Sequence, residues 1–175
     1  MARRRLPRLN ARRDGSAAVE FAMVALPFMI MLFSVLEIAF VFVLDSVLEN
    51  AVIETGRLVR TGQADAASYT STNFKTGVCN RMSIFASGCS AKLTVDVRVI
   101  PQFTNPNPPD PLGGGGFSAT QMTYTNGQPG NLMLVRAWYK HTLFTPFLQS
   151  GLSRLGDGSA YLMATTAFRN EPWDG

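Results

Sequence analysis

Few residues in this chain have the types and spacing that enzymatic chemistry requires. His141 is the only histidine, no Gly-x-Ser-x-Gly motif is present, and the acidic residues of the C-terminal part are scattered. No two of them stand at a spacing typical of general acid and base catalysis. Four consecutive glycines, 113–116, have the composition of a phosphate-binding loop, but no Gly-Lys-Ser/Thr follows them. We therefore predict that the protein is not an enzyme and has no catalytic residue, no cofactor and no small-molecule substrate.

Cys79 and Cys89 are the only cysteines, and they lie ten residues apart in a segment rich in Ser, Asn and Gly. They could form a disulfide or supply part of a metal site. A structural zinc site needs about four ligands, and only the distant His141 could join the two thiols. A disulfide is favoured if this segment lies in an oxidising compartment.

A further group with chemical potential lies near the N-terminus, in the sequence Asp14-Gly15-Ser16-Ala17-Ala18-Val19-Glu20-Phe21. A glycine before a scissile bond lets an extended peptide enter a peptidase groove, so a cut between Gly15 and Ser16 would release a short basic leader. Glu20 stands at the edge of an apolar run. A carboxylate near the membrane centre costs about 2.5–3.5 kcal/mol on insertion scales, and less toward the interface. Glu20 therefore needs a partner, such as a new amino group on Ser16, or it reaches the lipid head groups.

The positive charge of the chain is confined to its N-terminal tail. The formal net charge is +4, but six of the sixteen basic residues are arginines within the first 13 residues, and the chain from residue 16 onward carries ten basic and eleven acidic residues. A basic tail directly before an apolar run is a cytoplasmic topogenic signal, because Lys and Arg stay inside during insertion. We therefore expect no nucleic acid as a partner.

The apolar run predicts one membrane-spanning helix. From Ala17 to Leu44 only Glu20, Ser34 and Glu37 are polar. Phe21–Leu44 would span roughly 36 Å as a helix, which crosses a hydrocarbon core of about 30 Å with slight tilt. The run is too long for an ordinary secretory signal, and a buried helix of a soluble protein would rarely be apolar on all faces. Pro27 predicts a kink and not a break.

Glu37 is the second acid within the run. It lies about 100° around the helix from Glu20 and about 25 Å further along, so the two carboxylates cannot share one partner. Near the outer interface, Glu37 could extend to water, or it could contact the helix of a partner protein. The sequence leaves both interpretations open.

Several segments resemble the TadE-like segment of tight-adherence pilus proteins. They are Ser16–Ala22, Pro27, Leu36–Ile38 and Asn50–Arg57, and the resemblance covers residues 15 to about 62. Gly15 with Glu20 also resembles the type III signal of type IV pilins, which a prepilin peptidase cuts after the glycine. The resemblance implies a type IV pilin-like fold and a place in the bacterial inner membrane.

The same resemblance implies the function of a minor pseudopilin, needed for assembly of a tight-adherence pilus used in adhesion. Its implied partners are prepilin peptidase, other pilin-like proteins and the pilus assembly platform. Assembly contacts would involve Glu20, Phe21 and Glu37, with Glu20 opposite the N-terminal amine of an adjacent subunit. The chain has no room for the large domain of many TadG proteins, which leaves a TadE or TadF type. The alternative is a signal-anchored envelope protein whose binding domain is unrelated to pili and whose leader stays on.

These observations predict an α+β fold with three parts: a leader over 1–15, a helix with an amphipathic extension over 16–62, and an extracytoplasmic, periplasmic β-rich domain over 63–175. The helix should run from Ser16 to Thr61 and pack on a small antiparallel sheet. Alternation predicts a strand from Leu93 to Val99 that ends at Pro101, and later strands are predicted over 131–142 and 159–169. The segment 101–116, with five prolines, should be a loop. We read the rest as loops, and the predicted compartment favours the Cys79–Cys89 disulfide.

Overall fold

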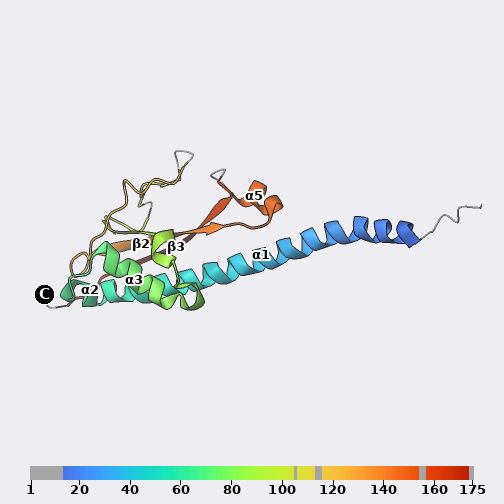
Figure 1. The fold of residues 1–175 in the computed structure, drawn as a ribbon. Coiled ribbons are helices and arrows are strands. Elements are labelled where there is room, and N and C mark those ends of the chain that lie inside the picture. The colour runs from blue at the N-terminus through green and yellow to red at the C-terminus, as the bar shows by residue number, and fades with distance from the viewer. Residues whose placement is uncertain (1–13, 105, 113–115, 154–156, 174–175) are drawn as a thin grey trace, which may run out of the picture.

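The computed structural model describes residues 14–104, 106–112, 116–153 and 157–173. Helix α1 (Asp14–Arg60) is continuous over 47 residues and contains Pro27. Its N-terminal half extends away from the rest of the chain, and its C-terminal half lies along a small domain (Figure 1). The predicted helix is therefore confirmed, with slightly different ends. Most of the predicted leader, residues 1–13, lies outside the described residues.

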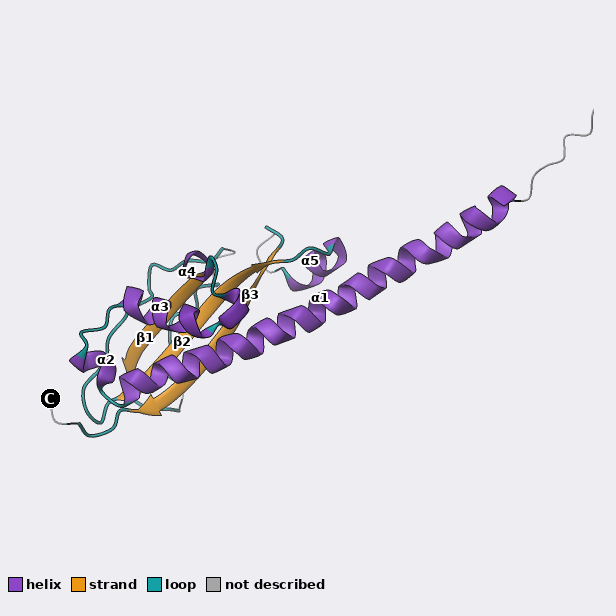
Figure 2. Ribbon diagram, turned by 60° about the horizontal axis from the view of Figure 1, so that its bottom comes forward, coloured by secondary structure: helices purple, strands orange, loops and turns teal. Residues whose placement is uncertain are grey.

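The domain is built on a three-stranded antiparallel sheet in the order β1-β2-β3. The strands are β1 (Leu93–Ile100), β2 (Leu132–Thr142) and β3 (Ser159–Arg169), so all three predicted strands are confirmed. The C-terminal half of α1 lies across one face of this sheet (Figure 2). Helix residues at spacings of three and four fill the core together with alternate strand residues: Leu44, Leu48, Ala51, Val52, Val59, Val95, Val97, Met133, Val135, Ala137 and Ala164.

Short helices cover the same side of the sheet beside α1. They are α2 (Gln63–Ala66), α3 (Ser71–Arg81), the 3-10 helix η1 (Ser83–Phe85) and α4 (Cys89–Lys92), and a further helix, α5 (Pro146–Leu152), follows β2. The interpretation of 71–92 as loop is therefore wrong. A capping box between Thr70 and Asn73 begins α3, and burial of Phe74 and Val78 holds it against α1. Tertiary packing thus outweighs the weak helix propensity of this polar segment.

Cys79 and Cys89 form the predicted disulfide, with 5.6 Å between their Cα atoms. The bond joins α3 to the start of α4, which leads directly into β1. Both cysteines are buried in the core cluster. Closure of a ten-residue loop stabilises such a small domain by roughly 2–3 kcal/mol.

Candidate membrane and assembly interface

The N-terminal half of α1 presents apolar side chains to its surroundings on every side. Every residue from Gly15 to Phe33 is exposed except Ala25, which is half-buried. By length and composition, α1 is the one helix among the described residues that could cross a membrane. Exposed apolar side chains in such number are unfavourable in water, so this half of α1 requires a lipid or protein environment.

Four of the residues expected to serve processing and assembly lie at the free end of this helix: Gly15, Ser16, Glu20 and Phe21. Ser16 Oγ donates a hydrogen bond to Glu20 Oε1 at 3.0 Å, one turn away. Phe21 is 75% exposed. A side-chain carbon added to Gly15 would meet nothing within 4 Å. The structure therefore places Gly15, Ser16, Glu20 and Phe21 together, far from the domain and open to an incoming partner.

Glu37 is positioned quite differently, because it lies where the domain first meets α1. Its carboxylate accepts hydrogen bonds from two backbone N–H groups, that of Phe144 and that of Thr145, the latter at 2.8 Å. Only 8% of the residue is exposed. Neither water nor a partner helix is needed to satisfy this carboxylate, so both interpretations of Glu37 from sequence missed its main contact. An additional partner contact at this position stays a prediction.

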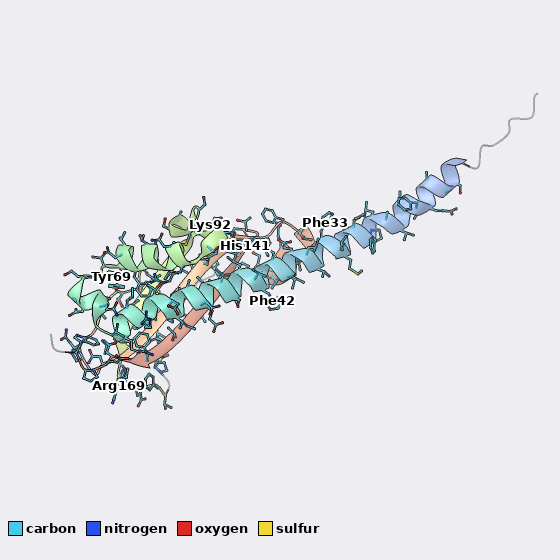
Figure 3. All side chains as sticks on the ribbon, turned by 90° about the horizontal axis from the view of Figure 1, so that it is seen from below. Phe33, Phe42, Tyr69, Lys92, His141 and Arg169 are labelled. Atoms are coloured by element: carbon cyan, nitrogen blue, oxygen red, sulfur yellow. A yellow bond between two sulfur atoms is a disulfide. The ribbon has the colours of Figure 1, made fainter. Side chains whose placement is uncertain are left out.

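Aromatic side chains surround the Glu37 contact. Phe40 lies against Phe85 of η1, with 5.4 Å between ring centroids, and against His141 of β2, at 5.5 Å. Burial lowers the pKa of His141 below its usual 6.5, and the nearby charge of Glu37 only partly opposes this. His141 is therefore neutral at neutral pH. It packs on Phe40 and makes no ion pair with Glu37 (Figure 3 shows His141 beside α1).

The Glu37 contact can be tested by substitution. Glu37→Ala should lower the free energy of unfolding by about 1–3 kcal/mol, because two N–H groups lose their acceptor in a partly buried place. Glu37→Gln keeps one acceptor oxygen, so its free energy of unfolding should lie between those of the alanine variant and the parent. Chemical denaturation in detergent micelles measures the three values.

A matched control is Glu49→Ala, which removes an exposed carboxylate from the same helix. This control should change the free energy of unfolding by less than about 0.5 kcal/mol. Equal losses in Glu37→Ala and Glu49→Ala would show that the bonds to Phe144 and Thr145 do not hold the domain against α1.

A second polar cluster lies on the sheet face turned away from α1. Asp96 of β1 is fully buried and stands opposite Arg136 of β2 in the strand register. It accepts hydrogen bonds from Arg136, from Arg98 and from the backbone N–H of Thr123. Burial alone would raise the pKa of Asp96, but these hydrogen bonds outweigh burial and lower it. The carboxylate therefore stays ionised and fully engaged, which suits a structural role and not that of a general base.

The same arginines hold the long segment between β1 and β2 against the sheet. Arg98 Nη2 donates to the carbonyl of Gln121 at 2.8 Å, and Arg136 Nη1 donates to that of Pro109 at 3.0 Å. The Arg136 guanidinium also lies 4.8 Å from the Trp138 ring. Sequence reasoning missed this cluster because the alternation that predicts β1 does not indicate which residues its polar side chains contact. The available signal was a charged residue within each of two predicted strands, Asp96 and Arg136, which does not by itself fix their pairing.

Comparison with protein families matches part of this chain to a family. Residues 15–67 match the family described as TadE-like protein, a stretch that ends one residue after α2. Searches of curated proteins and of solved structures gave no match. The matched stretch contains Gly15, Ser16, Glu20, Phe21 and Glu37, whereas the three strands lie outside it.

Proposed function

We propose that this chain, whose residues 15–67 form a TadE-like segment, is a minor pseudopilin that serves assembly of a tight-adherence pilus of the Flp, type IVb-like kind. In this proposal α1 crosses the bacterial inner membrane once, with the N-terminus in the cytoplasm and the domain in the periplasm. The observation that carries the proposal is the form of α1. One unbroken helix is exposed and apolar over its first half and packed on an antiparallel sheet over its second half.

The two halves of α1 divide the work of such a protein. The exposed half is available first to lipid and then to other pilin-like helices, and Glu20 and Phe21 at its end are the residues we expect to make that contact. We propose no catalytic role for the domain, whose buried carboxylate at Asp96 is already paired with two arginines. The partners we propose are prepilin peptidase, other pilin-like proteins and the assembly platform.

Processing after Gly15 is the first test of this function. In cells that express the cognate prepilin peptidase, the mature protein should begin at Ser16, and Gly15→Asp should remain uncut. The added side chain would block entry of the peptide into the peptidase groove. It would not disturb the fold of the chain itself, since the space around Gly15 is open. Intact-mass measurement of the purified protein reads the N-terminus directly.

A matched control places the same substitution at Gly116, which is also surrounded by open space. Gly116→Asp should be cut as the parent is. Retention of Met1 or Ala2 in the parent protein would contradict the pseudopilin proposal and favour a signal-anchored envelope protein whose leader stays attached.

A further inference from the structure

Among the large apolar residues outside α1 whose exposure the structure describes, two are far more exposed than the rest. Ile84 of η1 is 81% exposed, and Phe144, between β2 and α5, is 79% exposed. Single exposed apolar residues are common on soluble domains and need no explanation by themselves. These two residues are informative because of where they lie relative to α1.

Both residues lie beside the same turn of α1. The backbone N–H of Phe144 donates to the carboxylate of Glu37, which fixes Phe144 at that level of the helix. Phe85, the neighbour of Ile84, packs edge-to-face on Phe40, three residues after Glu37. The end of the domain that faces the free half of α1 therefore carries Phe144 and Ile84 at the level of residues 37–40.

The length of α1 indicates how deep residues 37–40 lie in the bilayer. Residues 21–37 span about 24 Å as a helix, whereas the hydrocarbon core of a bilayer is about 30 Å thick. If the hydrocarbon begins near Phe21, directly after Glu20, the turn at Glu37 lies within its outer part, and any tilt of α1 places it deeper. The helix remains apolar and exposed past this turn, at Phe42 and Val43.

A groove at the same level continues the lipid-facing surface of α1 onto the domain. It has a volume of about 860 Å³ and is lined by Ile30, Phe33, Leu36 and Phe40 of α1 and by Phe144 and Thr145. Glu37 also borders it, but its carboxylate is already bonded to the backbone of the domain. The groove therefore offers an occupant almost only apolar surface, which suits a hydrocarbon chain better than a polar peptide.

We propose that the domain makes a second contact with the membrane, in which Phe144 and Ile84 insert among the phospholipid acyl chains of the outer leaflet and an acyl chain occupies the groove beside Phe144. This inference rests on the membrane insertion of α1 that the proposed function includes. The two insertions, together with the Glu37 bonds, hold the domain upright on the membrane surface. The domain then lies at the membrane interface and is not attached to the membrane through α1 alone.

Spin labels at single introduced cysteines test the contact. The native cysteines are joined in a disulfide and do not react with the label. The full chain is placed in nanodiscs of phosphatidylethanolamine and phosphatidylglycerol, one chain per disc, with a label at Phe144→Cys or at Ile84→Cys. Two control variants carry the label at Phe33→Cys, on the free half of α1, or at Val99→Cys, an exposed site at the far end of β1. Collision with oxygen, which partitions into lipid, is compared with collision with a water-soluble nickel complex.

The ratio of oxygen to nickel collisions should be higher at residues 144 and 84 than at residue 99 and should approach the ratio at residue 33. A lipid-like ratio at 33 with water-like ratios at 144 and 84 would overturn the second contact and leave the membrane helix intact. A water-like ratio at 33 would overturn both. Labels at 144 and 84 could instead be shielded from both reagents, or their spectra could broaden through contact between two copies of the chain at higher protein content. Either result would assign this surface to protein contact and overturn the proposal.

Discussion

Asp96→Asn is expected to lose about 3–5 kcal/mol of unfolding free energy, which is a large part of the stability of a domain of this size. The substitution keeps the shape of the side chain but removes the charge that two arginines share. Arg136, whose side chain is only 7% exposed, would then remain buried with no anion beside it. Urea denaturation of the detergent-solubilised protein at neutral pH measures the loss.

Asp157→Asn is a matched control, because Asp157 also pairs with a cation, Lys140, but both side chains are about 40% exposed. An exposed pair contributes about 0–1 kcal/mol, so this variant should unfold close to the parent. The stabilisation by Asp96 should also be lost in acid. The pKa of Asp96 is lowered on folding, so its contribution is complete above its unfolded value near 3.8 and is lost as pH falls through the folded pKa. Equal losses in the two variants at neutral pH would contradict the structural role of Asp96.

Glu20→Ala should still be processed but should assemble poorly. We expect processing to depend mainly on Gly15 and the leader, and removal of a charge makes membrane insertion easier. The variant would lose a charge-assisted contact to an N-terminal amine, worth roughly 1.5–3 kcal/mol, which corresponds to a ten- to hundredfold weaker association. Co-expression with the pilus genes, followed by measurement of cleavage, co-purification and surface pili, separates these steps.

Glu49→Ala is again the control, since Glu49 is exposed on the part of α1 that follows the apolar run. Normal pili and normal co-purification from Glu20→Ala would show that Glu20 only reaches the head groups. If both variants assembled poorly, the defect would concern carboxylates along α1 in general and not the contact at its end.

The elements with a clear repeating pattern were predictable from the sequence. The strand from Leu93 ends where Pro101 removes a backbone donor, and the apolar run continues into a face of α1 at spacings of three and four. Helix α3 was not predictable in this way. Its sequence is mostly polar, and it is held by a capping box at Thr70 and by burial of a few apolar side chains against α1.

The contacts that give the site its form depend on residues far apart in the sequence. Glu37 and Phe144 are 107 residues apart, and Asp96 and Arg136 are 40 apart. The polar character of Glu37 within an apolar run was visible, but its acceptor role depends on how β2 leads into α5. Pairing of Asp96 with Arg136 depends on a register that the periodicity of one strand does not reveal.

The attachment of the domain to α1 has a mechanical consequence. The bonds from Glu37 hold one end of the domain, and at the other end the N–H of Glu171 donates to the carbonyl of Arg60 at 2.8 Å. Between these two points β3 lies along α1 (Figure 2). Phe168 and Thr166 of β3 are close to Gly56 of α1. A tensile load applied to the free half of the helix would act in shear along the whole contact between α1 and β3. Because α1 is helical without interruption, no flexible segment would have to extend before the load reached the sheet.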